Sequence, residues 1–268
     1  MNIYHKLDWN KCLSHEIWES FKKGWPESDE EVHFFWGLAG KNVSEIQKCM
    51  DENKKWFYVD VGYFTEQITR YPEPKINNYD KTYFRIVHQN LHTITGSVGT
   101  GERLSELESK GINVEFKGWE TGGTKHILVC PSSQMVTHTI NGMNQDEWIK
   151  QTIEDIRTRT NREIKVRNKP RPGNEFWGTD IKDSLKGAHC LVTNMSLSAI
   201  DAVMNMTPVI CDVKNVCYPI SKKLENIENA ECPSRKDFAH WLKIVAENQF
   251  TIPEIESGKA FEVFKKQL

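Results

Sequence analysis

Short apolar runs alternate with stretches of helical periodicity along the C-terminal half of the chain. HILVC at 126–130 and PVIC at 208–211 are typical of these runs, which are four or five residues long. Strands that are buried on both faces have this uniformly apolar pattern, because helices cover both sides of a parallel sheet. The pattern therefore predicts strands at 126–130, 163–167, 190–193 and 208–211, and helices at 145–157, 180–186 and 198–206.

The N-terminal half begins with a predicted strand–helix–strand unit. VHFFW at 32–36 is followed by a glycine turn, and Ser44 with Gln47 three residues later is typical of a capped helix start. WFYVDV at 56–61 predicts the second strand, which this order of elements places parallel to the first. Residues 65–82 have little periodicity and predict a long loop. The other predicted elements are a strand at 83–87 and helices at 102–109, 235–247 and 259–267.

These elements predict an α/β protein with two lobes, built on mostly parallel sheets that carry helices on both faces. A length of 268 residues suits two small domains. The glycine-rich stretch GWETGGT at 118–124 is the clearest break between them. We therefore expect an N-terminal lobe at 1–118, a C-terminal lobe at 119–247, and a C-terminal helix within 248–268 that packs back on the lobes.

Composition and charge narrow the range of partners. The chain is 38% hydrophobic and 27% charged, which suits a globular protein with a real core. Its 35 Lys and Arg residues are balanced by 37 Asp and Glu residues, so no global basic field indicates a nucleic-acid partner. No apolar run reaches the ~20 residues of a membrane helix, and MNIYHKLDWNKCLSHE is too polar for a signal peptide. We expect a cytoplasmic protein without a membrane partner.

Cysteine usage gives no sign of a disulfide framework or a metal site. The seven cysteines are odd in number and scattered, with no CxxC pair and no Cys–His cluster at zinc-ligand spacing. Cys130, Cys190 and Cys211 lie in apolar runs, where a free cysteine acts as a small hydrophobe. We expect reduced thiols and no metal.

Hydroxyl and basic side chains follow the predicted strands of the C-terminal half. Parallel sheets bind ligands beyond the carboxyl ends of their strands. There, the free N–H groups and the dipole of a helix that follows such serines attract anions, and basic residues neutralise a diphosphate. Taken singly, each serine is equally explained as a helix cap and each cation as a solvated side chain. The predicted donor-binding residues are Ser132, Ser133, Arg167, Lys169, Ser196, Ser198 and Asp201, the last either as a ligand of two ribose hydroxyls or as a helix-dipole aspartate.

The segment LVTNMSLSAIDAVMNMTPVI at 191–210 resembles the C-terminal signature of GT-B glycosyltransferases, in which a strand, a serine-containing turn, a helix and a Pro-Val-Ile strand bracket the donor. The family usually has glycine before that proline and glutamate at the ribose position, where this chain has Thr207 and Asp201. A weaker similarity extends over 119–247. The resemblance implies two Rossmann-like lobes of the GT-B type and a nucleotide-sugar donor, most simply a UDP-sugar, with no permanently bound cofactor.

VDVGYF at 59–64 resembles the acidic-Gly-aromatic turn of capsule-type sugar transferases, whose acidic residue lies near the acceptor. Asp60 matches that residue and is the candidate catalytic base, or alternatively a turn aspartate at the Gly62 bend. His33, His88 and His92 are other candidate bases.

Arg85 and Asn90 follow the long loop and are predicted to bind the acceptor, with Arg103 as a further candidate.

The chain also resembles small bacteriophage glycosyltransferases that modify hydroxylated or hydroxymethylated pyrimidines in DNA. That resemblance implies double-stranded modified DNA as a partner and the host cytoplasm as the location. Basic and aromatic residues available for DNA are Lys22, Lys23, Trp25, Arg70, Lys75, Lys81 and Arg85, although such charges are ordinarily solvated. A capsule-type glycan transferase, a sugar-nucleotide epimerase and a non-catalytic nucleotide-binding module remain alternatives, and the oligomeric state stays open.

Overall fold

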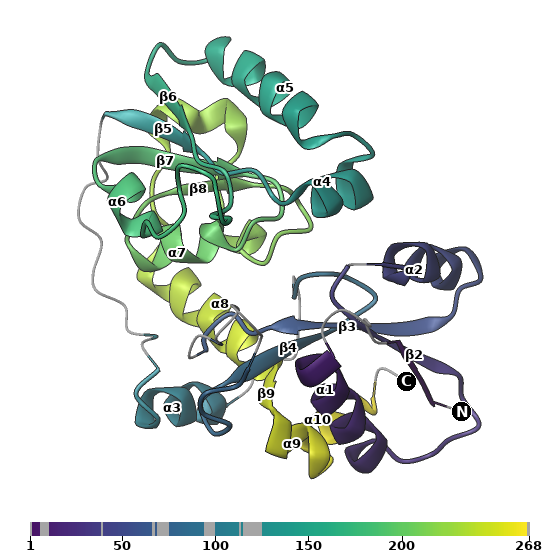
Figure 1. Cartoon of the computed structure of the whole chain (residues 1–268). Coiled ribbons are helices and arrows are strands. Elements are labelled where there is room, and N and C mark those ends of the chain that lie inside the picture. The colour runs from purple at the N-terminus through teal and green to yellow at the C-terminus, as the bar shows by residue number, and fades with distance from the viewer. Residues whose placement is uncertain are drawn as a thin grey trace. The chain divides into compact units, whose positions relative to one another are not determined.

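The chain forms two compact units, each with its own sheet (Figure 1). One unit consists of Met1–Asn113 and Lys243–Leu268, and the other of Val114–Leu242. The expected lobe boundary between 118 and 119 lies outside the described residues. The fold is α/β, as predicted, with one mixed and one all-parallel sheet. The computed structural model describes residues 2–5, 11–38, 40–65, 68, 75–93, 100–112, 114 and 125–266.

The first unit is built on a five-stranded mixed sheet. β1, β2 and β3 are parallel, as the strand–helix–strand order predicts, whereas β4 is antiparallel to both of its neighbours. The strands, in their order across the sheet, are β1 (Asn2–His5), β2 (Val32–Trp36), β3 (Lys55–Val61), β4 (Tyr83–His88) and β9 (Gln249–Thr251). The two edge strands, β1 and β9, are not among the strands that the sequence predicts.

Helices cover both faces of this sheet, with α1, α9 and α10 on one face and α2 on the other (Figure 1). Leu13, Ile17 and Phe21 recur every four residues along α1, so they form one apolar stripe. This stripe joins Phe34 and Phe57 in one core, where the two phenylalanine rings stack with centroids 5.4 Å apart. The helices of this unit are α1 (Lys11–Gly24), α2 (Asn42–Asp51), α3 (Glu102–Ser109), α9 (Ile252–Glu256) and α10 (Lys259–Phe264).

The start of α2 differs from the sequence prediction. The helix begins at Asn42 with Lys41 as its N-cap, so the prediction that Ser44 caps it is wrong. The side-chain amide of the buried Asn42 donates to the carbonyl groups of Trp36 at 2.9 Å and Gly37 at 3.1 Å. These bonds fix the helix start to the end of β2. Ser44 lies within the first turn, where its hydroxyl donates to the Lys41 carbonyl at 2.9 Å.

The second unit is built on a four-stranded sheet in which every pair is parallel. The sequence predicts each of its four strands, and the boundaries differ by one or two residues. Across the sheet their order is β6 (Glu163–Val166), β5 (His126–Val129), β7 (Ala188–Thr193) and β8 (Val209–Cys211). β7 is buried along its whole length, because it is an inner strand with helices on both sides.

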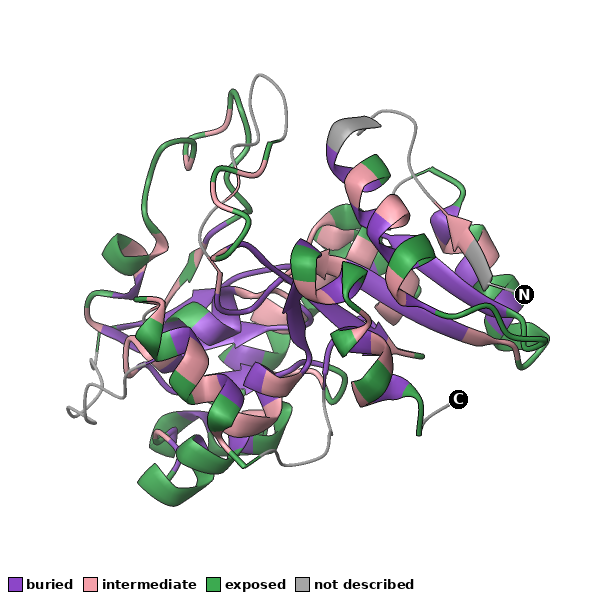
Figure 2. Cartoon of the chain, turned by 90° about the horizontal axis from the view of Figure 1, so that it is seen from below, coloured by how far each residue is buried: buried purple, intermediate pink, exposed green. Residues whose placement is uncertain are grey.

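In this unit α4 and α5 lie on one side of the sheet, and α6 and α7 on the other (Figure 1). Figure 2 shows buried strands flanked by helices whose outer surfaces are exposed. The helices are α4 (Gln134–Asn141), α5 (Gln145–Arg157), α6 (Ile181–Leu185), α7 (Ser198–Met204) and α8 (Arg235–Glu247), with 3-10 helices at Tyr218–Ile220 and Leu224–Asn229. The boundary between the two units falls within α8.

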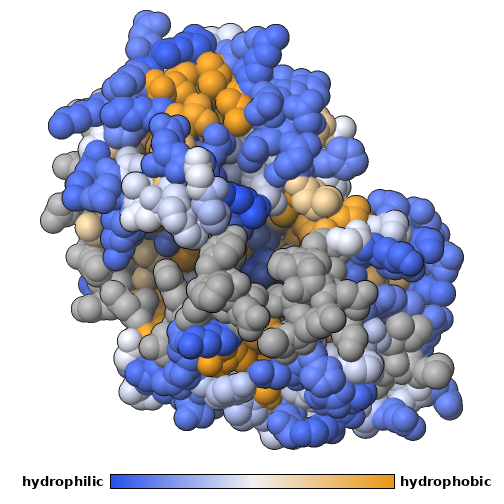
Figure 3. Space-filling view, in the orientation of Figure 1, coloured by the Kyte–Doolittle hydropathy of each residue, from blue (hydrophilic) through white to orange (hydrophobic). Residues whose placement is uncertain are grey.

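Within the described part of the chain, every helix is too short or too polar to cross a membrane. Hydrophilic residues cover most of the face seen in Figure 3, with a few apolar areas between them.

Candidate functional site

Asp60 lies near the end of β3, directly opposite Arg85 of β4 in the sheet register. Its Oδ2 atom accepts hydrogen bonds from Nη2 of Arg85 at 3.0 Å and from the Tyr58 hydroxyl at 2.8 Å. Its Oδ1 atom accepts one from the Val61 amide at 2.8 Å. Tyr58 and Asp60 share a face of the strand because alternate residues point the same way. The Asp60 side chain is 33% exposed, so a ligand can reach a carboxylate whose position is fixed.

Arg85 is buried beside Asp60, with 4% of its side chain exposed. Its Nη1 atom donates to the Val61 carbonyl and its Nε atom to the Leu91 carbonyl at 3.4 Å, so each nitrogen of the guanidinium has a protein partner. The guanidinium also lies 5.4 Å from the ring centroid of Tyr63. The sequence predicts an acceptor contact for Arg85. Its geometry instead suits a residue that holds Asp60 and the loop after β4 in place.

The loop after β4 carries two further predicted residues. Asn90 is half-buried, and its Oδ1 atom accepts the amide of the next residue at 2.8 Å. His92 is buried, and this burial together with the charge of Arg85 lowers its pKa well below 6.5, so the ring is neutral at pH 7. The negative charge of Asp60 acts in the opposite direction and raises the pKa of His92, but by less. His92 is therefore the candidate histidine that belongs to the Asp60 cluster.

The other two candidate histidines make different contacts. Nδ1 of His33 lies 3.2 Å from Nε2 of His5, and Nε2 of His33 lies 3.2 Å from a carboxylate oxygen of Glu31. The ring of His88 packs on Phe57 with centroids 4.9 Å apart. Burial lowers the pKa of both His33 and His88. These contacts suit structural histidines of the first sheet.

The second sheet has a topological switch point between β5 and β7. From β5 the chain passes to β6 on one side, and it then crosses to β7 on the other side of β5. In doubly wound sheets, ligands bind at such a point, beyond the carboxyl ends of the two strands. Ser132 follows β5 and Ser196 follows β7. The structure thus places two of the predicted donor segments on the adjacent strands that flank the switch point.

A network of buried side chains joins these strand ends. The Asn194 Oδ1 atom accepts the Ser132 amide at 2.9 Å, and the Ser132 hydroxyl accepts the Met195 amide at 3.0 Å. The Asn194 amide group donates to the Thr137 hydroxyl of α4 at 3.2 Å, and Asn215 donates to the Asn194 carbonyl at 2.9 Å. Sequence reasoning assigned no role to Asn194, Asn215 or Thr137. The signal for Asn194 was present, since a buried amide directly after an apolar strand needs partners.

The starts of α4 and α7 show which of the predicted serines cap a helix and which helix amides are already hydrogen-bonded. Ser133 is the N-cap of α4, but its side chain makes no capping hydrogen bond. The N-cap of α7 is Leu197, and the Ser196 hydroxyl accepts the Ser198 amide at 3.3 Å. The next two amides of α7 also bond within this turn. The first amides of α7 are thus already satisfied by the protein.

Asp201 lies in the first turn of α7 at the protein surface. Protein atoms packed around its carboxylate, together with the negative charge of Asp180, raise its pKa to about 6. Nearby, the Ser198 hydroxyl is buried beside the Cys130 thiol, whose pKa burial raises to about 12. Cys130 is therefore protonated and unreactive at neutral pH.

The structure separates the two predicted phosphate ligands after β6. Arg167 is buried, and its guanidinium donates to Thr179 and Ser184. Lys169 is exposed two residues later. Of this pair only Lys169 is presented to solvent.

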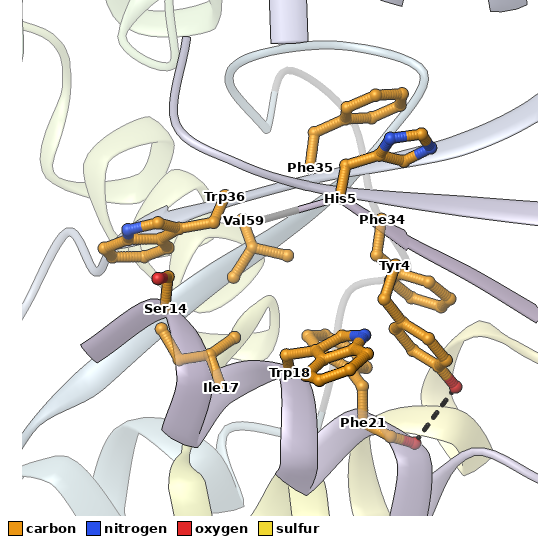
Figure 4. A pocket seen from close by; sticks show the side chains of 10 residues that line it. All are labelled: Tyr4, His5, Ser14, Ile17, Trp18, Phe21, Phe34, Phe35, Trp36 and Val59. Carbon is orange, nitrogen blue, oxygen red and sulfur yellow. Dashed lines mark hydrogen bonds between the residues drawn. The ribbon is translucent and has the colours of Figure 1, made fainter. Parts of the chain in front are cut away.

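Cavities and metal-ligand clusters do not mark another site in the described residues. An aromatic cavity between α1 and the first sheet, lined by Tyr4, Trp18 and Trp36 among others, has a volume of about 10 Å³ (Figure 4). That volume holds about one water molecule. An open depression of about 720 Å³ follows the exposed side of α3. No group of three His, Cys, Asp or Glu residues in the described ranges could hold a metal ion.

Two of the solved structures with a similar fold come from one organism. No protein-family model matches the chain, and no curated protein matches it in sequence. KpsC of Thermosulfurimonas dismutans, a beta Kdo 2,4 transferase, is 13% identical with a TM-score of 0.49 over 82% of this chain and 80% of that one. A KpsC beta Kdo 2,7 transferase of the same organism is 12% identical with a TM-score of 0.47 over 100% and 99%. At this level of similarity neither structure bears on the activity, which has to be argued from the residues.

Proposed function

We propose that this protein is a glycosyltransferase that moves a sugar from a nucleotide-sugar to a hydroxyl group. The observation that carries the proposal is the switch point between β5 and β7, where Ser132 after β5 hydrogen-bonds to Asn194 and Met195 after β7. Doubly wound sheets bind nucleotides at this position. The resemblance of 191–210 to a donor-binding signature falls on β7, α7 and β8, which form one side of that point.

We assign donor binding to the second unit and acceptor binding to the first. Asp60 is the candidate base, because its carboxylate is fixed, partly exposed and able to accept the proton of an acceptor hydroxyl. The acceptor oxygen then bonds to the anomeric carbon, the bond from that carbon to the nucleoside diphosphate breaks, and the diphosphate leaves with its electron pair. Arg85 and Tyr58 hold the Asp60 carboxylate in place through their hydrogen bonds to Oδ2.

Replacement of Asp60 by asparagine tests this assignment. Asp60→Asn keeps the shape of the side chain but removes the basic oxygen, so we expect a loss of about 10²- to 10⁴-fold in kcat with unchanged donor affinity. Transfer would be followed by mass spectrometry over a panel of nucleotide-sugars and acceptors, with release of nucleoside diphosphate measured in parallel. Asp51→Asn, at an exposed position in α2, is the control.

Each alternative function has its own outcome in that experiment. Conversion of a nucleotide-sugar to an isomer without any acceptor would indicate an epimerase. Binding without turnover by the wild type would indicate a non-catalytic module. Full activity of Asp60→Asn would remove Asp60 from the chemistry and leave the fold-level proposal standing.

A hydroxylated pyrimidine in DNA stays a prediction for the acceptor. Lys22 pairs with Glu19 at 2.7 Å and Lys23 with Glu256 at 2.6 Å, which leaves less positive charge for a DNA backbone. Trp25 is buried in the core and unavailable for base stacking, and Arg70 lies outside the described residues. Binding to modified duplex DNA that weakens steeply with added salt would support a DNA acceptor, and transfer to soluble glycans alone would reject it.

A further inference from the structure

The predicted phosphate ligand Arg167 is built into the protein rather than exposed to a ligand. Only 6% of its surface is exposed. Its Nη2 atom donates to the Thr179 carbonyl at 3.0 Å and to the Thr179 hydroxyl at 2.9 Å, and Nη1 donates to the Ser184 hydroxyl at 3.1 Å. The ring of Phe176 lies 5.1 Å from the guanidinium carbon. Arg167 therefore fastens the far end of the loop at 168–179, which we call the β6–α6 loop, to the end of β6.

A second side chain fixes the middle of the β6–α6 loop. The Oδ1 atom of Asn174 accepts the amides of Arg171 and Phe176, each at 3.2 Å, and its Nδ2 atom donates to the Lys169 carbonyl at 3.0 Å. Backbone bonds from Asn174 to Arg171 and from Trp177 to Asn174 add two turns. The backbone of the β6–α6 loop is thus held at its middle and at its far end before any ligand binds.

The β6–α6 loop exposes two cations and one carboxylate, Glu175, so its surface charge is positive overall. Lys169 and Arg171 are both exposed. The Arg171 guanidinium has no ion-pair or hydrogen-bond partner in the described structure, where only its backbone is bonded. Many other cations of the chain lie in ion pairs, such as Lys186 with Asp183 at 2.8 Å. An unpaired guanidinium on a fixed backbone can bind a phosphate with little loss of backbone entropy.

The β6–α6 loop borders the donor segments. The loop ends at Asp180, which is the N-cap of α6, and helix α6 packs against α7. At the start of the loop, the Arg167 amide donates to the carbonyl group of Val129, the last residue of β5, at 2.9 Å. The loop is therefore next to the switch point between β5 and β7.

We propose that the β6–α6 loop is a preformed phosphate-binding arm, in which Arg171 contacts the donor diphosphate and Arg167 acts as a positioning residue through the loop. This inference rests on the proposed function, since it names how the same site binds its donor. Arg167 thus positions the loop, whereas the sequence suggests that it binds the phosphate directly. Arg171 supplies the positive charge that the bonded amides of α7 do not.

A double-mutant cycle separates contact from positioning. Binding of UDP, CDP, ADP and GDP would be measured by calorimetry for the wild type, Arg171→Ala, Arg167→Ala and the double variant. Loss of a charge-assisted phosphate contact predicts about tenfold weaker binding for Arg171→Ala. Arg167→Ala is expected to weaken binding about three- to tenfold alone but less than about twofold in the Arg171→Ala background. Hydrogen exchange of 168–179 should become faster in Arg167→Ala.

Two further variants protect the test against misfolding. Asn174→Ala loosens the β6–α6 loop without touching Arg167 and should show the same dependence on Arg171. Lys236→Ala, an exposed cation of α8, is the control and should bind like the wild type.

Additive losses in Arg167→Ala and Arg171→Ala would overturn the inference, because they would show that Arg167 touches the phosphate itself. Wild-type affinity in Arg171→Ala would overturn it too. If the wild type binds none of the four diphosphates, the proposed function fails as well.

Discussion

At the scale of single residues, Asp201 is the candidate ligand whose charge the protein tolerates least. Although the residue is exposed, many protein atoms lie near its carboxylate and reduce its hydration, and Asp180 adds a second negative charge nearby. Both effects favour the protonated acid and raise the pKa of Asp201 to about 6. At pH 7 the group is ionised in the folded state at a cost in stability. Groups kept in such a state are often found at binding sites.

We predict that Asp201→Asn stabilises the protein at alkaline pH. The folded-state pKa is raised above 3.8, the ordinary value for an aspartate, so the unfavourable term is absent at low pH and grows as pH rises through about 6. The variant should melt about 1–3 °C higher than the wild type near pH 8, with the difference shrinking towards pH 4. Asp183→Asn, which removes an exposed partner of Lys186, is the control and should gain nothing. A constant gain across this range would contradict the assignment.

The sequence located the candidate residues better than it described their surroundings. Asp60 lies near the end of β3 with a third of its side chain exposed, and Asp201 lies exposed in the first turn of α7. Arg85 and Arg167 lie at the expected places in the chain but are buried, and their donors are used by backbone and side-chain oxygens of the protein. An arginine that binds a phosphate and one that ties a loop look alike in sequence, because the difference depends on acceptors far along the chain. Asn194 was missed although it directly follows an apolar strand.

At the scale of elements, a buried ionic cluster joins α3 to β9 and α9. Nη2 of Arg103 donates to a carboxylate oxygen of Glu254 at 2.6 Å, and Nε donates to the Gln249 carbonyl at 3.1 Å. Glu254 also closes a capping box with Thr251 at the start of α9 and pairs with Lys259 at 2.7 Å. One side chain thus links two segments that are about 150 residues apart in the chain. Buried pairs of this kind are costly to break, because the remaining partner keeps an unpaired charge.

Glu254→Gln is predicted to destabilise the first unit by about 3 kcal/mol at pH 7. Burial alone would raise the pKa of Glu254, but hydrogen bonds from Arg103 outweigh it and lower the pKa to about 2. The stability from ionised Glu254 is therefore present above 4.5, the ordinary pKa of a glutamate, and is lost as pH falls from there towards 2. Urea unfolding at pH 7 and at pH 3 should show the gap between variant and wild type closing. Glu256→Gln, which removes an exposed pair with Lys23, should cost less than about 1 kcal/mol.

Neither periodicity nor length alone decided which elements were predicted: the 14-residue α1 was missed despite its apolar stripe, whereas the three-residue β8 was predicted. The bounds of β2, α3, α5 and α8 agree with the prediction, since each has a clear apolar pattern. β9 is three residues long and includes the polar Gln249, so only its pairing with β4 makes it a strand. α9 was missed although Thr251 and Glu254 have the spacing of a capping box and Pro253 stands at its first turn.

At the scale of the whole molecule, the two units differ in how the chain builds them. The second unit is one continuous segment, whereas the first combines the N-terminal part with Lys243–Leu268. The first unit also concentrates histidines whose charged form is disfavoured. Burial lowers the pKa of four of them, His5, His33, His88 and His92. The pKa of His92 is lowered most strongly, because the charge of Arg85 adds to the effect of burial.

We predict that mild acid destabilises the first unit before the second. A histidine whose folded-state pKa is depressed contributes stability that is present above about 6.5 and is lost as pH falls towards its folded value. Between about pH 7 and 5, hydrogen exchange should therefore accelerate in β2, β3 and β4 before it does in β5 and β7. His88→Gln removes one such group at a half-buried position and should flatten this pH dependence, whereas substitution of the exposed His15 by Gln should leave it unchanged. Equal acceleration in both sheets would mean that buried carboxylates, rather than these histidines, control acid stability.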